Sequence, residues 1–70
     1  MELPQILGLN VRHWRKLRGM SQEELALEAN MKRSYVSDLE RGTRNPSIKA
    51  IARLAKALEV EPEVLVRHKK

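Results

Sequence analysis

Five polar residues with hydrogen-bonding side chains lie close together near the middle of the chain: Arg33, Ser34, Tyr35, Ser37 and Asp38. An arginine can donate two parallel hydrogen bonds to O6 and N7 of guanine, and a carboxylate can accept one from N4 of cytosine. Serine hydroxyls can bond a base edge or a phosphate, and a tyrosine can bond a phosphate or pack on the methyl group of thymine. These residue types suit the reading of base edges, although they would also suit an ordinary solvated helix face. Asp38 has a second candidate role, which is to position Arg33.

Basic residues surround this polar group. Between Lys32 and Lys49 the chain has five basic residues and two acidic ones, whereas residues 22–31 contain three glutamates and no basic residue. The whole chain has a formal charge of +5, which attracts polyanions such as DNA, RNA or an anionic membrane surface. Contacts with phosphates fix the position of a protein on a duplex without reading its sequence. Such contacts are expected from Lys32, Arg41, Arg44 and Lys49.

The elements that hold these residues are expected to be short helices. Apolar residues recur every three or four positions, and no segment sustains the alternation of apolar and polar residues that indicates a strand. Gly19, Asn30 and Gly42 are expected to end three helices, because glycine and asparagine adopt the left-handed conformation most easily. Ser21 and Ser47 are expected to cap the starts of the second and fourth helices. The pattern predicts an all-α fold with helices at about residues 5–18, 22–30, 33–41, 48–58 and 61–65.

The fourth helix is expected to run from about Ile48 to Leu58. Its expected buried residues are Ile48, Ile51, Leu54, Ala55 and Leu58. In the first helix Trp14 follows Leu7 and Val11 at helical spacing, so it is expected in the core rather than on a base.

The segment from Gln22 to Arg41 resembles the helix-turn-helix unit of the phage repressor and Cro-type proteins, known as the XRE family. Ala26 matches the small residue at which the two helices cross. The buried positions of the unit are matched by Leu25, Ala29, Met31, Val36 and Leu39. The flanks, residues 12–22 and 40–47, also follow the family pattern. The resemblance implies a compact five-helix λ-repressor-like DNA-binding domain over residues 1–70, with the helix-turn-helix unit at about 22–41.

The resemblance also assigns roles to single residues. The third helix lies in the major groove of DNA, and Gln22 bonds a phosphate and braces that helix. Arg15 and Glu40 form an internal ion pair between the first and third helices, which makes them structural. Residues 30–37, followed by Glu40 and Arg41, resemble the small controller proteins of restriction–modification systems. The function implied is a sequence-specific DNA-binding transcriptional regulator.

The expected partner is duplex DNA, bound by two copies of the chain. A 70-residue monomer reads too few base pairs to find one site in a genome, so a homodimer on a palindromic operator is expected. The expected interface is the end of the fourth helix with the fifth: Leu58, Val60, Val64 and Leu65. An alternative is an antitoxin whose main partner is a toxin, with DNA binding as autoregulation. RNA polymerase is a further candidate partner, and charge alone would give binding to RNA or membranes without sequence preference.

Other classes of function are not expected. The chain has no cysteine and no set of nucleophile, base and orienting residue, so an enzyme is not predicted. Its two histidines are isolated and have no metal-ligand spacing. No apolar run approaches the roughly 20 residues that a membrane helix needs. We therefore expect a cytoplasmic protein without a cofactor, a metal or a membrane contact.

Overall fold

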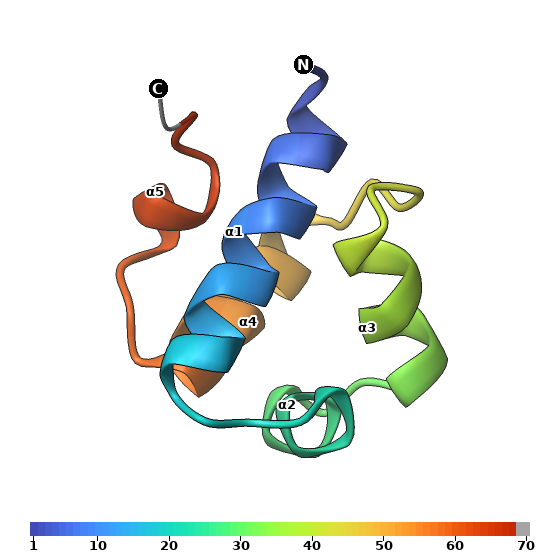
Figure 1. Cartoon of the computed structure of the whole chain (residues 1–70), viewed down its shortest axis with the longest axis vertical. Helices are drawn as coiled ribbons and strands as arrows, with labels where there is room; N and C mark the ends of the chain where they lie inside the picture. Colours follow the sequence, from blue (N-terminus) through green and yellow to red (C-terminus); the bar gives the residue numbers. More distant parts are fainter. Residues whose placement is uncertain (69–70) are drawn as a thin grey trace.

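Helices make up all of the regular structure in the part of the chain that the computed structural model describes, residues 1–68 (Figure 1). The five helices are α1 (Leu3–Leu17), α2 (Gln22–Ala29), α3 (Arg33–Glu40), α4 (Ile48–Leu58) and α5 (Pro62–Leu65). The expected all-α class and the order of five helices are confirmed. The bounds differ from the expected ones mainly at the start of α1, which begins two residues earlier because Pro4 lies in its first turn, where proline is tolerated.

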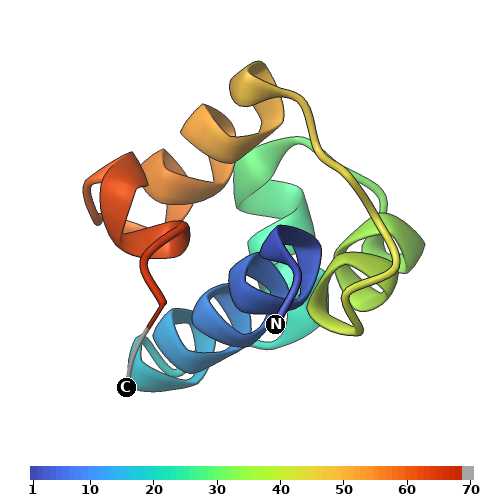
Figure 2. The same cartoon turned by 90° about the horizontal axis from the view of Figure 1, so that it is seen from above.

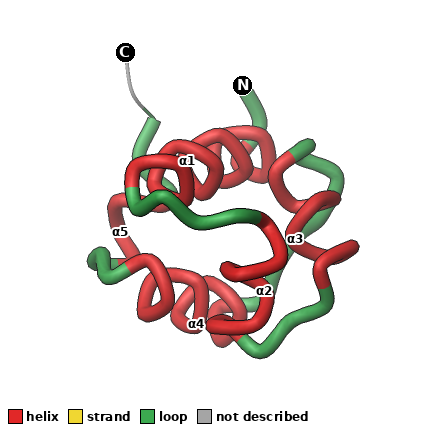
Figure 3. Tube along the Cα trace, turned by 60° about the horizontal axis from the view of Figure 1, so that its bottom comes forward, coloured by secondary structure: helices red, strands yellow, loops and turns green. Residues whose placement is uncertain are grey.

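The longest helix, α1, separates α3 from α5. In Figure 1 α3 lies on one side of α1 and α5 on the other, and the views in Figures 2 and 3 keep them on opposite sides. Helix α3 packs against α1 and α2, whereas α5 packs against α1 and α4. Helix α2 packs against both α3 and α4, so it connects the elements on the two sides of α1. The helix-turn-helix unit is thus formed by α2, the short turn after it, and α3.

Four helices end in the same way, with one residue of left-handed conformation. These residues are Gly19 (φ 70°), Asn30 (φ 57°), Gly42 (φ 79°) and Glu59 (φ 59°). In each case the amide of the next residue donates a hydrogen bond back to a carbonyl in the last turn of the helix, at 2.8–3.2 Å. The sharp exits predicted at the first three positions are confirmed.

The starts of α2 and α4 have serine caps, as expected. The Ser21 hydroxyl accepts a hydrogen bond from the Glu24 amide, and the Glu24 carboxylate accepts one from the Ser21 amide. The hydrogen bond that the Ser21 amide donates to the carboxylate lowers the pKa of Glu24. The Ser47 hydroxyl accepts a hydrogen bond from the Ala50 amide. Both caps fix where the chain enters a helix and so set the direction of α2 and α4.

The core lies where α1, α2, α3, α4 and α5 meet. The large side chains that are fully buried are Val11, Leu25, Val36, Leu39, Leu54, Leu58 and Leu65. Trp14 is partly buried and packs against this core. The backbones of α1 and α3 approach so closely at Gly8 that a Cβ atom there would lie 2.5 Å from the Leu39 carbonyl oxygen. Only glycine fits at this crossing.

The expectation for Ile48 is wrong. Its side chain is 85% exposed, whereas Ala50 is buried. Ile48 is the first residue of α4 and lies at the edge of the apolar face that Leu54 and Leu58 define. Successive residues turn by about 100° around a helix, so Ala50, and not Ile48, falls on the inward side of the first turn. The core therefore does not reach the first residue of α4, and Ile48 is exposed to solvent.

Candidate nucleic-acid interface

Helix α3 presents two different faces. Val36 and Leu39 are fully buried, whereas Arg33 and Ser34 are exposed. Tyr35 and Ser37 lie between the two faces and are half-buried. Within residues 1–68 the Arg33 guanidinium makes no hydrogen bond or ion pair, so its donors are available to a ligand. One edge of α3 is thus anchored in the core while the opposite edge offers a guanidinium and a hydroxyl group.

A buried ion pair fixes the end of α3 to α1. The Arg15 Nε and Nη2 atoms donate hydrogen bonds to the Glu40 carboxylate at 2.6 and 3.0 Å. The side chains of Arg15 and Glu40 are only 11% and 5% exposed. The hydrogen bond to Glu40 raises the pKa of Arg15, so the guanidinium is held in its charged form. The ion pair expected between these residues is present, and it locks the orientation of α3.

Two further hydrogen bonds complete this network. Arg15 Nη1 donates to the Met20 carbonyl at 2.8 Å, which ties the segment between α1 and α2 to the ion pair. Gln22 Nε2 donates to Glu40 Oε1 at 3.1 Å, so the first residue of α2 also holds the last residue of α3. No buried side-chain nitrogen or oxygen in residues 1–68 lacks a partner. The bracing role expected for Gln22 thus acts through Glu40.

Asp38 has a different partner from the expected one. Its carboxylate accepts hydrogen bonds from Arg41 and Arg44, the second at 3.5 Å, and not from Arg33. Residues five apart point about 140° away from each other around a helix, which explains why Asp38 and Arg33 do not meet. The role of Asp38 in positioning Arg33 is therefore wrong. The Thr43 hydroxyl and amide both donate to the Asp38 carbonyl, at 2.9 and 3.2 Å, and hold the loop against α3.

The predicted phosphate-binding residues are spread around α3. Arg41 and Arg44 lie just beyond its end, with side chains 66% and 49% exposed. The Arg44 guanidinium lies 5.1 Å from the centre of the Tyr35 ring, within the range of a cation–π contact. Lys32 precedes α3 and Lys49 is the second residue of α4, and both are exposed. Lys32 and the two arginines thus stand at opposite ends of α3.

The residues expected at a dimer interface fall into two groups. Leu58 and Leu65 have no exposed surface, so they belong to the core and cannot contact a second copy. That expectation is wrong for these two because α5 folds back on α4 and covers both leucines. Val60 and Val64 are half-buried and keep part of their surface in solvent.

Two side chains make tertiary hydrogen bonds that were not anticipated from the sequence. Asn10 is buried, and its Nδ2 atom donates to the carbonyls of Leu65 and Arg67 at 2.9 and 2.8 Å. Arg18 Nε donates to the Leu58 carbonyl at 2.8 Å. Both side chains bind free carbonyl groups at helix ends and so attach α1 to α4 and α5. Asn10 could have been noticed in the sequence because it places a polar side chain at an inward position of α1.

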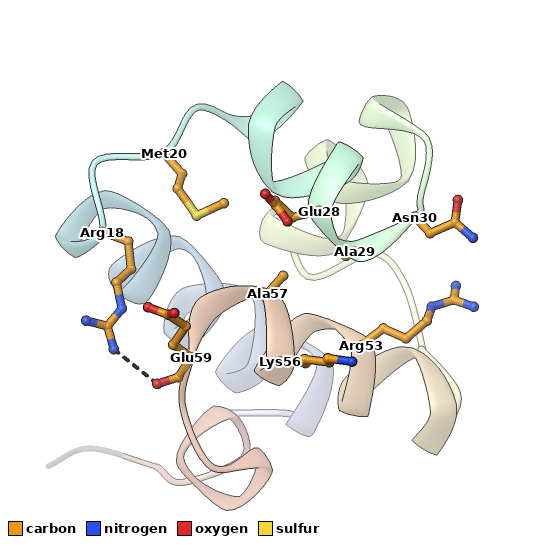
Figure 4. Close-up of a pocket in the computed structure, with 9 residues that line it drawn as sticks. All are labelled: Arg18, Met20, Glu28, Ala29, Asn30, Arg53, Lys56, Ala57 and Glu59. Atoms are coloured by element: carbon orange, nitrogen blue, oxygen red, sulfur yellow. Dashed lines mark hydrogen bonds between the residues drawn. The ribbon is translucent and has the colours of Figure 1, made fainter.

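A groove of about 560 Å³ lies between the ends of α1, α2 and α4. Figure 4 shows its lining, with Arg18, Arg53 and Lys56 among acidic and small residues, and with Arg18 bonded to the Glu59 carbonyl. None of the predicted DNA-contacting residues lines this groove. Residues 1–68 hold no group of three histidine, cysteine, aspartate or glutamate side chains placed to bind a metal. No helix in this range has the length and apolarity to span a bilayer.

Comparison with known proteins identifies the family to which this fold belongs. Residues 11–65 match the helix-turn-helix family HTH_3. The chain belongs to this helix-turn-helix family. Control protein C.BamHI of Bacillus amyloliquefaciens is 47% identical to this helix-turn-helix protein over 62 residues, which are 87% of the chain and 76% of that relative. The resemblance to controller proteins, expected from residues 30–41, is confirmed.

Two solved structures of controller proteins share the fold. The restriction–modification controller protein C.AhdI from Aeromonas hydrophila has a TM-score of 0.86 and 44% sequence identity, over 89% of this chain and 94% of that one. The controller protein C.Esp1396I, as a tetramer in complex with its natural 35 base-pair operator, has a TM-score of 0.84 and 35% identity, over 93% and 86% of the two chains. The family consists of DNA-binding regulators, so the expected class of transcriptional regulator is confirmed and the antitoxin alternative is not favoured.

Proposed function

We propose that this helix-turn-helix protein binds palindromic operator DNA as a homodimer, with α3 of each copy in the major groove. The observation that carries the proposal is the exposed edge of α3, where Arg33 has no partner within residues 1–68 and Ser34 is exposed. The buried network of Arg15, Gln22 and Glu40 holds this edge in one orientation before DNA arrives. A recognition surface that is fixed in advance loses little conformational entropy on binding.

We assign base contacts to the residues on this edge. Arg33 is the best candidate for a bidentate contact with guanine, because its guanidinium is exposed and near the start of α3, the end of a recognition helix that contacts bases. Ser34, Tyr35 and Ser37 lie beside it and are the further candidates. The sequence predicted Asp38 as a fifth base contact, but its carboxylate binds two arginines here, so the assignment of base contacts rests on the other four residues.

Phosphate contacts are assigned to the cations around α3 and to the start of α2. The group consists of Gln22, Lys32, Arg41, Arg44 and Lys49. Gln22 is the first residue of α2, where free backbone N–H groups favour an anion. These contacts would fix the register of the duplex and leave the choice of sequence to α3.

The homodimer is assigned to apolar residues left at the surface by α4, the segment between α4 and α5, α5 itself and the residue after it. We call Ile48, Val60, Val64 and Val66 the dimer strip; Ile48 is 85% exposed and Val66 37% exposed. The operator complex of C.Esp1396I contains a tetramer, which supports the use of more than one copy on one duplex. Because the proposed ligand is duplex DNA, the same proposal places the protein in the cytoplasm. A contact with RNA polymerase stays a prediction from the sequence.

The experiment that tests base reading is selection from a pool of random duplexes, followed by binding measurements on two variants. We expect selection to recover a palindrome. Arg33→Ala should weaken binding to that palindrome by about 1–3 kcal/mol and lose discrimination at one base pair in each half-site. Arg44→Ala should instead weaken binding to all duplexes alike.

A matched control comes from α1. Arg12 is exposed, makes no hydrogen bond or ion pair within residues 1–68 and is not one of the predicted DNA-contacting residues, so Arg12→Ala removes the same charge from α1. Its effect on binding should be small and equal for all duplexes. If random duplexes compete as well as the selected one, or if Arg33→Ala behaves like Arg12→Ala, base reading by α3 is wrong.

A further inference from the structure

We propose that Asp38 acts as an internal substitute for a DNA phosphate, which occupies Arg41 and Arg44 in the free protein and must release them when DNA binds. This inference rests on the proposed function, because it requires that the two arginines bind phosphates. It assigns to Asp38 control over affinity for every duplex, rather than the reading of one base. The observation is a single carboxylate shared by the two arginines that lie nearest to the end of α3.

The geometry places one carboxylate oxygen on each arginine. Arg41 Nη2 donates to Asp38 Oδ1, and Arg44 Nη2 lies 3.5 Å from Asp38 Oδ2. A phosphate also offers two oxygens to arginines, so the carboxylate occupies donors that a phosphate would use. The Thr43 hydroxyl and amide hold the loop between the two arginines against the Asp38 carbonyl. These hydrogen bonds keep the loop that carries both arginines close to Asp38, so each guanidinium group lies within reach of its carboxylate.

The exposure of the three side chains makes exchange with DNA feasible. Asp38 is 29% exposed, and Arg41 and Arg44 are 66% and 49% exposed. Ion pairs at such exposure are weak and break easily, whereas a buried pair such as Arg15–Glu40 does not. Within residues 1–68 the Arg15–Glu40 pair holds the fold, whereas the two exposed contacts of Asp38 are ones that a phosphate can replace.

Arg44 also connects this exchange to α3. Its guanidinium contacts Asp38 and lies 5.1 Å from the centre of the Tyr35 ring, so it bridges a carboxylate and a predicted base-contacting residue. Movement of Arg44 to a phosphate would leave the face of Tyr35 open. Phosphate binding and the exposure of Tyr35 are therefore coupled in this arrangement.

The consequence is a limit on affinity that does not depend on sequence. Phosphate contacts supply most of the non-specific binding of a basic protein, and a genome offers a large excess of non-specific sites. A carboxylate that competes for two phosphate-binding arginines lowers that background. It lowers the affinity for the operator by the same factor, because the same arginines contact phosphates in both complexes.

The test is a double-mutant cycle measured with a random-sequence duplex and with the selected palindrome. The four proteins are the natural chain, Asp38→Asn, the pair Arg41→Ala/Arg44→Ala, and the combination of all three changes. Asp38→Asn should tighten binding to both duplexes by the same factor, about two- to tenfold. In the background that lacks both arginines, the gain should fall to the level of simple charge removal.

That level is measured with Glu28→Gln. Glu28 is exposed on α2, forms no ion pair within residues 1–68 and lines the groove away from α3, so its change adds the same unit of charge. Three results would overturn the role of Asp38: no gain with Asp38→Asn, an equal gain with and without the arginines, or a changed preference at one base pair. If the loss of both arginines does not weaken binding at all, the assigned phosphate contacts fail as well.

Discussion

Glu40 and Asp38 are acidic residues two positions apart on α3, and their surroundings give them opposite roles. Glu40 is 5% exposed and receives hydrogen bonds from Arg15 and Gln22, whereas Asp38 contacts arginines that are mostly in solvent. The cost of removing a charged side chain depends on whether its partner is left buried and unpaired. At the residue scale, the two acids should therefore separate stability from DNA binding.

We expect Glu40→Ala to lower the free energy of unfolding by about 3–5 kcal/mol, because it leaves the Arg15 guanidinium buried without its ion pair. Asp38→Ala should lower it by less than about 1 kcal/mol, since exposed ion pairs contribute little. Urea or thermal unfolding of the two variants side by side measures the difference. Equal midpoints for the two would contradict the structural role of the Arg15–Glu40 pair.

Single residues were predicted from the sequence where a motif fixed their spacing. The Arg15–Glu40 pair and the bracing residue Gln22 follow from the helix-turn-helix pattern, and all three meet in the structure. Arg44 as a partner of Asp38 could not be predicted, because it depends on how the loop after α3 turns back, whereas Arg41 lies at the ordinary i,i+3 spacing. Asn10 was missed for a similar reason, since its partners lie 55 and 57 residues away.

At the scale of the elements, the sharp helix ends determine the path of the chain. Three of the four left-handed positions carry glycine or asparagine, which accept this conformation at little cost, and the fourth carries Glu59. Hydrogen bonds after α4 hold Glu59 there, and Arg18 binds its carbonyl oxygen at 3.1 Å. The strain therefore persists because the surrounding contacts require the turn.

Glu59→Gly should raise the free energy of unfolding by about 0.5–1 kcal/mol. The relief of left-handed strain exceeds the entropy that a glycine adds to the unfolded chain, and the carbonyl bound by Arg18 is kept. Glu59→Gln is the matched control, because it removes the charge and retains the strain, and it should leave stability nearly unchanged. Thermal unfolding checks both. An equal rise for the two variants would point to charge and not to conformation.

Element boundaries were predictable because caps and stops are local features of the sequence. Ser21, Ser47, Gly19 and Gly42 mark ends that the structure has at these places. Ile48 stands three residues before Ile51, a spacing that favours burial, but relative to Leu54 and Leu58 it falls at the edge of the apolar face and is exposed. The burial of Leu58 and Leu65 depends on α5 folding back over α4, which is a tertiary contact.

At the scale of the whole molecule, the recognition helix and α5 lie on opposite sides of α1 (Figure 1). Two copies joined through α4 and α5 would therefore carry their α3 helices at the outer ends of the pair. Successive major grooves on one face of DNA are about 34 Å apart. The molecule measures 28 × 20 × 20 Å, so a pair of copies is long enough to span that distance.

The dimer strip gives the last prediction, because Ile48 is exposed and can be changed without opening the core. Ile48→Lys should shift the chain to a monomer in sedimentation at micromolar concentration and weaken operator binding, while its unfolding midpoint extrapolated to low concentration stays the same. Leu27→Lys is the matched control, since Leu27 on α2 is 82% exposed, close to the 85% of Ile48, but lies outside the strip. It should leave the dimer intact. A charge should disrupt the dimer only where a second copy covers it. The dimer strip would therefore not be the interface if both lysine variants dissociated equally. The same conclusion would follow if the natural chain were a monomer at high micromolar concentration.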